Sequence, residues 1–336
     1  MYGTLRLRVI SLLFLNGELL RGGRMRKTSI GGEALIEGVM MRGPDNMAIA
    51  IRKPGGEIAV EKKPLRTLAK RHPFFKTPVI RGAVGIFESM VFGVKALMYS
   101  AESVGFEEDK NAEPSKFDKF VEKIFGGKGQ DGVIYFSVII AMAFAVGLFI
   151  LLPNLVAGFM RFDRHTVSGL LYYNLFEGVL RIILFVGYIA LVSRMKDIQR
   201  VFMYHGAEHK TIHCYEHEEE LTVENARRYT TRHPRCGTAF LLIVMVVSIL
   251  VFSFLGWHNI LINIVSRLIL IPLVAGLSYE LMKLAGRSDS KLISWVYAPG
   301  LALQRFTTRE PDDGQIEVAI EALKNVLVED KNADRW

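Results

Sequence analysis

The sequence has few cysteines and no internal repeat. Only two cysteines, Cys214 and Cys236, occur among 336 residues, which is too few for a disulfide framework and suits a reduced, cytoplasmic setting. RNA-binding signatures with interleaved aromatic residues are also missing, so nucleic acid is expected as a partner only indirectly, through a ribosome.

The first 25 residues do not have the features of a signal peptide. The stretch from Leu12 to Leu20 is weakly apolar, is interrupted by Asn16 and Glu18, and lacks a small-residue cleavage site. We interpret residues 1–25 as an N-terminal extension, with Met25 as an alternative start.

Long apolar runs are abundant. Hydrophobic residues make up 50% of the chain, and their concentration in runs is typical of an integral membrane protein. Four runs are close to the roughly 20 residues that cross a bilayer core; they are Val133 to about Met160, Leu170 to Val192, Thr238 to Trp257 and Ile260 to Met282. The expected fold class is membrane α-helical, with four transmembrane helices in the lipid bilayer.

The distribution of basic residues predicts the orientation of these helices. The net charge is +8, and lysines and arginines gather between the second and third runs and after the fourth. The two short hairpins that join the runs in pairs carry few of them. Both termini and the loop of residues 194–237 are therefore expected in the cytoplasm.

The flanking segments predict a small sheet and amphipathic helices. Apolar residues alternate on both sides of the turn at residues 54–56, which predicts a small antiparallel β-sheet within residues 26–77. In residues 78–131, a charge every seventh residue from Arg81 to Glu102 forms one stripe on an apolar helix. That helix is expected at the membrane interface or against the bundle, with a fifth span as the alternative.

The chain thus divides into seven parts. They are the extension (1–25), the sheet region (26–77), the amphipathic helix and charged linker (78–131), a transmembrane hairpin (132–193), the cytoplasmic loop (194–237), a second hairpin (238–283) and a cytoplasmic helical tail (284–336).

Histidines concentrate in the cytoplasmic loop. His205, His209, His213 and His217 recur every fourth residue, so a helix would stack their rings along one face, with neighbours about 5–6 Å apart. Such a face is suited to holding a metal ion. The alternative is a set of solvated polar residues, with Cys236 as a small buried hydrophobic residue.

One motif within this stretch points to hydrolysis. His205-x-x-Glu208-His209 matches the inverted zincin pattern, in which two histidines bind zinc and the glutamate deprotonates the attacking water. Several residues are candidates for the third ligand: His213, Cys214, His233, Cys236 and Glu280.

A second motif points to structural zinc. His233-Pro234-Arg235-Cys236-Gly237 has the form of a zinc knuckle with histidine as its first ligand. Combined with His209 and His213, it would give a closed site with nitrogen and sulfur ligands.

Ionisable residues also occur inside the predicted spans. Glu177 and Arg181 are four residues apart in the second run, and Arg267 lies in the fourth. Because such groups are costly at membrane depth, they should face one another as a neutralised packing cluster, or line a substrate pathway. Glu280 should lie near the cytoplasmic end, where it could be a ligand or support one.

Four stretches of the chain resemble those of the bacterial YqhQ-like family. They are Gly32 to Arg42, His205 to Lys210, His233 to Thr238 and Pro311 to Asp313, and the resemblance extends over nearly all the chain from about Arg26. It implies a multispan protein of the bacterial cytoplasmic membrane. The family has no known function and is commonly labelled as predicted metal-dependent enzymes.

Two functions follow as hypotheses. The first is a zinc-dependent hydrolase at the cytoplasmic membrane face, acting on a membrane-protein segment, a peptide or a lipid head group. The second is a non-catalytic membrane factor, in which zinc stabilises the loop and the basic surface binds a ribosome, a translocase or another membrane protein. Three protein ligands plus water, with Glu208 within reach of that water, would favour the enzyme, and four protein ligands would favour the factor.

Overall fold

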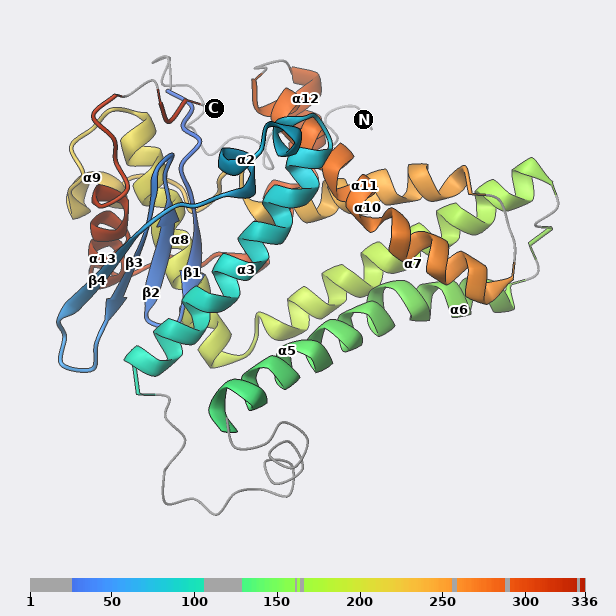
Figure 1. Ribbon diagram of the computed structural model, residues 1–336, viewed down its shortest axis with the longest axis horizontal. Helices are drawn as coiled ribbons and strands as arrows, with labels where there is room; N and C mark the ends of the chain where they lie inside the picture. Colours follow the sequence, from blue (N-terminus) through green and yellow to red (C-terminus); the bar gives the residue numbers. More distant parts are fainter. Residues whose placement is uncertain are drawn as a thin grey trace, which may run out of the picture.

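The computed structural model describes residues 26–105, 129–160, 162–163, 166–255, 259–287, 291–330 and 333–335. The predicted N-terminal extension and most of the charged linker lie outside these ranges. The described chain forms a mixed α/β part and an apolar helical bundle that extends away from it (Figure 1).

A four-stranded antiparallel sheet forms the centre of the α/β part. Its strands are β1 (Gly31–Leu35), β2 (Gly38–Arg42), β3 (Asn46–Arg52) and β4 (Ile58–Pro64), in the order β1-β2-β3-β4. This confirms the predicted small antiparallel sheet. Short turns join successive strands, as the local sequence of residues 54–56 led us to expect.

Both faces of the sheet are buried. Val39, Met41, Ala48 and Ala50 face a core shared with α8 (Lys196–Glu216) and α13 (Asp313–Lys324). Residues at intervening positions, including Met40 and Ile51, face α3 (Ile80–Ser103). Because the alternation has apolar or small residues on both sides, the sheet is a middle layer between helices.

Smaller helices complete this part of the fold. They are α2 (Leu68–Arg71), the 3₁₀ helix η1 (Pro73–Lys76) and α9 (Val223–Arg227). The C-terminal helix α13 begins with a capping box, in which Asp312 accepts from the Gln315 backbone N–H and the Gln315 side chain accepts from that of Asp312. This reciprocal cap explains why the predicted helix start falls directly after Pro311.

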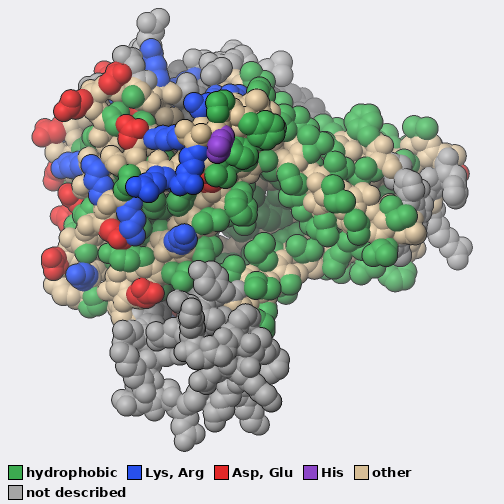
Figure 2. All heavy atoms as spheres, viewed as in Figure 1, with side chains coloured by type: hydrophobic (Ala, Val, Ile, Leu, Met, Phe, Trp, Pro, Cys, Tyr) green, Lys and Arg blue, Asp and Glu red, His purple; other side chains and the backbone are tan. Residues whose placement is uncertain are grey.

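The bundle consists of long apolar helices. They are α5 (Gly129–Val146), continued through the π-helical turn η2 (Gly147–Leu151) into α6 (Leu152–Phe159), then α7 (Val167–Val192), α10 (Gly237–Ser253), α11 (Ile260–Arg287) and α12 (Lys291–Thr307). Hydrophobic side chains cover this arm, whereas charged side chains gather over the sheet (Figure 2). This division is the one expected of a protein with a bilayer-facing part.

Four described helices are long and apolar enough to cross a membrane, which agrees with the predicted number but not with the predicted set. They are Ile80–Ser103, Phe136–Phe159, Val167–Val192 and Leu261–Ala285. The predicted span from Thr238 to Trp257 is shorter, because α10 ends at Ser253 after 17 residues, or about 25 Å of helix against a core of about 30 Å.

Helix α3 joins the two parts of the molecule. Its N-terminal end packs closely on α11, where Gly82 lies against the Tyr279 side chain. Its C-terminal half packs on the sheet through Phe92, Ala96 and Tyr99. The helix is thus held on the apolar face of the sheet along half its length, while its length and composition would also allow it to cross a membrane. The interfacial and the spanning interpretations of this helix both stay predictions.

Candidate metal centre

Helix α8 carries the histidine face and is buried in spite of its polar sequence. One side of it, including Tyr204, Ala207 and Ile212, joins the apolar core with the sheet and α13. The side chains of His209, Lys210 and Glu216 are also buried. The histidines are therefore not solvated surface residues, and each needs a partner inside the protein.

Three donor atoms converge at the middle of this face. One ring nitrogen each of His205 and His209 and the sulfur of Cys236 lie within 4.8 Å of one another. The Nε2 atom of His205 is 3.2 Å from Cys236 Sγ. Zn–N and Zn–S bonds are about 2.0–2.3 Å long. Two donor atoms this close together could therefore bind one zinc ion after only a small shift of their side chains.

Backbone carbonyls determine how these two histidines present their nitrogens. His205 Nδ1 lies 2.8 Å from the Thr307 carbonyl oxygen, and His209 Nδ1 lies 2.6 Å from that of Thr231. Because a carbonyl only accepts, each Nδ1 carries the proton and donates it. Each Nε2 is therefore the ring nitrogen turned toward the other donors, which is the arrangement of metal-binding histidines held by outer hydrogen bonds.

Cys236 is suited to act as a thiolate. It is the N-cap of α10, where its sulfur accepts from the Thr238 N–H. Burial opposes ionisation of the thiol, but the His205 and His209 imidazoles outweigh it and hold the pKa of Cys236 well below its usual range. Burial also lowers the pKa of His205, and the Cys236 thiolate more than reverses this, raising the pKa to about 9.

Glu208 lies beside these donors, and only one of its two carboxylate oxygens accepts a hydrogen bond from the described residues. Its Oε1 accepts from the Gly32 N–H at 3.0 Å, and a side chain at position 32 would collide with the strand and crowd the Glu208 carboxylate. Burial raises the pKa of Glu208. Among the described residues, Glu208 Oε2 and His209 Nε2 are both buried without a hydrogen-bond partner. Two such atoms on adjacent residues fit a site that receives a cation or water.

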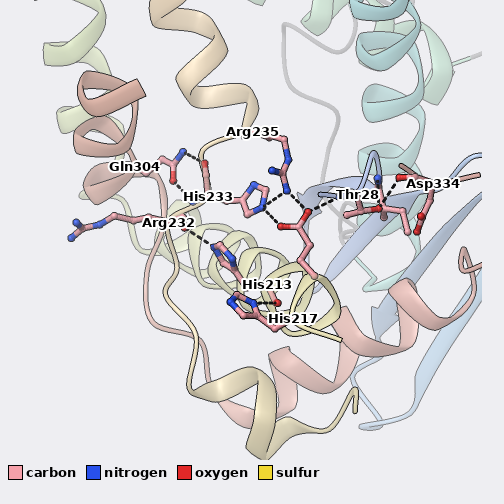
Figure 3. A network of polar contacts seen from close by, with 10 residues as sticks. Thr28, His213, His217, Arg232, His233, Arg235, Gln304 and Asp334 are labelled. Carbon is pink, nitrogen blue, oxygen red and sulfur yellow. Dashed lines mark hydrogen bonds and ion pairs between the residues drawn. The ribbon is translucent and has the colours of Figure 1, made fainter. Parts of the chain in front are cut away.

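A second group of donors lies one to two turns further along α8. Donor atoms of His213, Glu216 and His233 are within 4.8 Å of one another. Figure 3 shows His213 and His233 within the network of polar contacts that surrounds this group. Burial lowers the pKa of His213 to about 3 and that of His233 well below its usual range, so both rings are neutral at pH 7. Glu216 was not a sequence candidate, although its position three residues after His213 places it on the same face.

An arginine already supplies a positive charge to this second group. Arg235 forms a buried ion pair with Glu216 and lies 3.4 Å from His233 Nε2. The Glu216 carboxylate also accepts from the Thr28 N–H at 2.7 Å. Gln304 fixes His233 by exchanging two hydrogen bonds with its backbone (Figure 3). These contacts make the group a junction between the N-terminal segment, α8 and α12.

The predicted ligands fall into two adjoining groups, with the rings of His209 and His233 5.6 Å apart between their centroids. His205, His209 and Cys236 form one group, whereas His213 and His233 belong to the other. His233 and Cys236, the two predicted knuckle ligands, belong to different groups. The turn between them, in which the Cys236 N–H donates to the His233 carbonyl, places Cys236 next to His205 and His209.

Two further candidates have other partners. Cys214 lies in the apolar core, with its sulfur 3.4 Å from the Glu220 carbonyl oxygen, and burial raises its pKa to about 11. The sequence predicted that Glu280 would be a metal ligand or support one, but its carboxylate has other partners. Its Oε1 accepts from Arg81 Nε at 2.7 Å and from the Val79 N–H at 3.2 Å. The packing of α3 on α11 explains this difference.

The charges within the bundle form a cluster of their own. Glu177 lies between Arg181 and Arg267 and pairs with both. Arg181 also donates to Ser248 Oγ at 2.9 Å. The cluster joins α7, α10 and α11 and leaves no cavity for a water molecule between its side chains, which favours the packing role over a substrate pathway.

Comparisons with known proteins agree with the family resemblance. Residues 77–329 match the family described as Protein of unknown function (DUF1385). The Uncharacterized protein YqhQ of Bacillus subtilis (strain 168) is 34% identical over 302 residues, which cover 88% of this chain and 92% of that protein. No solved structure matches the chain.

Proposed function

The chain belongs to the YqhQ-like DUF1385 family of unknown function, and we propose that it is a metal-dependent hydrolase with its site at the cytoplasmic membrane face. His205, His209 and Cys236 would hold the ion. Their mixed nitrogen and sulfur donors favour zinc over magnesium or calcium. Glu208 would be the general base.

One observation supports this proposal above the others. Two histidines have their Nδ1 atoms held by carbonyls and direct their Nε2 atoms to one thiol, while the adjacent Glu208 keeps one buried oxygen without a hydrogen-bond partner. Three protein donors leave a fourth tetrahedral position for water, and a nearby carboxylate can take a proton from that water.

Each residue then has a defined role. The metal would supply Lewis acidity and bring the pKa of water at the site toward about 7. Glu208 would accept the proton on Oε2, while the Gly32 N–H holds Oε1 in place. Thr231 and Thr307 keep the imidazoles oriented through their carbonyls. The substrate class that suits this location is a membrane-protein segment, a peptide or a lipid head group.

The second hypothesis, a zinc-stabilised binding factor, is favoured by burial. His209 is only 1% exposed and His233 only 4%, and a structural ion needs no access for substrate. Zinc held by His205, His209 and Cys236 would tie α8 to the N-terminal end of α10. The enzyme proposal requires this region to open so that a substrate reaches Glu208.

The test compares Glu208→Gln with wild type in a strain lacking the gene. Glutamine keeps the size of the side chain and the acceptor for the Gly32 N–H but removes the proton acceptor, so zinc content and thermal stability should stay unchanged while rescue of the strain's phenotype is lost. Glu224→Gln, at an exposed position in α9, is the matched control and should rescue. Full rescue by a well-expressed Glu208→Gln protein would exclude hydrolysis at this site and favour the binding factor.

A further inference from the structure

A cleft separate from the histidine face lies where the sheet meets the apolar helices. It has a volume of about 420 Å³, and its polar lining comes from Arg42 of β2, Thr67 and Lys76 around α2 and η1, Arg81 and Glu88 of α3, and Tyr279 of α11. A cleft of this size is large enough for a small charged head group.

The charges that line this cleft are mostly positive. Three cationic side chains face one carboxylate, that of Glu88, and Glu88 Oε1 already accepts from the Leu68 N–H at 2.6 Å. Arg81 is paired with Glu280, and Arg42 lies near the carboxyl groups of Glu33 and Glu88, so the exposed Lys76 supplies the excess. An anion is therefore the complementary ligand.

The surface around the cleft extends this positive charge. Exposed basic residues follow one another along β4 and α2: Lys62, Lys63, Arg66, Lys70 and Arg71. Lys63 and Lys70 pair with Glu61 and Asp45, and the other three add to the positive charge. Figure 2 shows Lys and Arg side chains gathered over this part of the molecule, next to the start of the hydrophobic arm. Basic clusters directly beside membrane helices are typical of contact with an anionic leaflet.

Apolar side chains border the same region. Phe74 of η1 is 62% exposed, and Phe87 and Met90 of α3 are 65% and 53% exposed. Val84 of α3 lines the cleft, and Phe87 and Val91 follow it by three and seven residues. Residues at these spacings lie on the same side of a helix, so the exposed apolar face of α3 begins at the cleft. A ligand with a charged head and apolar tails would satisfy both surfaces.

We propose that this cleft binds the head group of an anionic phospholipid, with its phosphate between Arg42 and Lys76 and its acyl chains along the exposed face of α3. The bound lipid would hold α3 at the membrane surface and fix the sheet against the bundle. This inference concerns neither the metal donors nor Glu208, and it stands independently of the proposed hydrolase.

The test measures lipid binding to the full chain purified in a neutral detergent. Phosphatidylglycerol and phosphatidylcholine with identical acyl chains are added separately, and bound lipid is counted by native mass spectrometry. We expect a preference for phosphatidylglycerol in wild type. Lys76→Glu should weaken its binding roughly five-fold or more, since one basic residue near an anionic lipid contributes about 1 kcal/mol.

Lys53→Glu is the matched control, because Lys53 is also exposed but lies in the β3–β4 turn, outside the cleft lining. This variant should bind the lipid as wild type does. Equal binding of the two lipids, or equal weakening by both variants, would overturn the proposal. Displacement of the lipid by millimolar inorganic phosphate alone would also overturn it, since the site would then recognise a free phosphate. Unchanged thermal stability of Lys76→Glu without lipid shows that its effect is not misfolding.

Discussion

The Nε2 atom of His205 lies 3.2 Å from the sulfur of Cys236, although 31 residues separate them in the chain. His205 belongs to α8, and Cys236 caps α10, the helix that enters the apolar bundle. A metal shared by these residues would therefore connect the sheet-bound helix α8 with the bundle. The first prediction tests this connection.

The two cysteines should differ in their contribution to metal binding. Cys236→Ser should lower zinc affinity roughly ten-fold or more, because it removes a thiolate donor, and should lower the unfolding temperature of the zinc-loaded protein. Cys214→Ser is the control, since this thiol lies in the apolar core away from the donors. Zinc per chain is measured by elemental analysis after dialysis against a weak chelator. Equal zinc in both variants would contradict the assignment of Cys236.

Glu33 should make stability depend on pH. Burial raises the pKa of Glu33 to about 7, against opposition from Arg42 and with a further contribution from Glu208. Because the folded-state pKa exceeds the unfolded value of about 4.5, the folded protein holds this proton more tightly. Its stabilising contribution is complete below about pH 4.5 and is lost as pH rises toward 7.

The variant Glu33→Gln isolates this effect, since glutamine resembles the protonated acid. Wild type and variant should have similar unfolding temperatures near pH 4.5, and the variant should become increasingly more stable than wild type up to about pH 7, with a constant difference above that. Thermal unfolding at several pH values measures the difference. A difference independent of pH would show that Glu33 ionises normally.

The three charges in the bundle should respond unequally to substitution. Glu177→Gln leaves two buried arginines without a counter-charge and should cost about 3–5 kcal/mol. Arg267→Met should cost less, because it leaves the Glu177–Arg181 pair intact, with Glu177 Oε1 2.6 Å from Arg181 Nη2. Unfolding temperatures in detergent measure both. A larger loss for Arg267→Met than for Glu177→Gln would contradict the role of Glu177 as the counter-charge shared by both arginines.

The orientation expected from the basic residues can be tested with introduced cysteines. Asn259→Cys, between α10 and α11, should react with a membrane-impermeant maleimide on intact cells, and Glu220→Cys, after α8, only after permeabilisation. Both native cysteines are buried, so the unmodified protein is the control for background labelling. The reverse pattern would place the histidine face outside the cytoplasm and exclude a cytoplasmic hydrolase.

Local sequence patterns predicted the elements that depend on neighbouring residues. The alternation around residues 47–60 predicted the antiparallel sheet, and apolar runs predicted long helices, because strand and helix periods are visible in short windows. The four-residue histidine period likewise predicted that a helix would place these rings on one face, and α8 does so. The predicted length of the third span was wrong, because apolar residues continue in the sequence beyond Ser253, where helix α10 ends.

The chain by itself determined the apolar helices, the sheet and the kinds of donor atom near the histidine face, since these follow from residue type and spacing. Only the tertiary structure decided the partners: Cys236 lies with His205 and His209, His233 lies with His213 and Glu216, and Glu280 pairs with Arg81. Those pairings depend on where α3, α10 and α12 pack against α8 and α11. Such contacts join residues far apart in the chain. The hydrophobic effect that drives this packing is non-directional, so the pattern of apolar residues in the sequence does not specify which two residues meet.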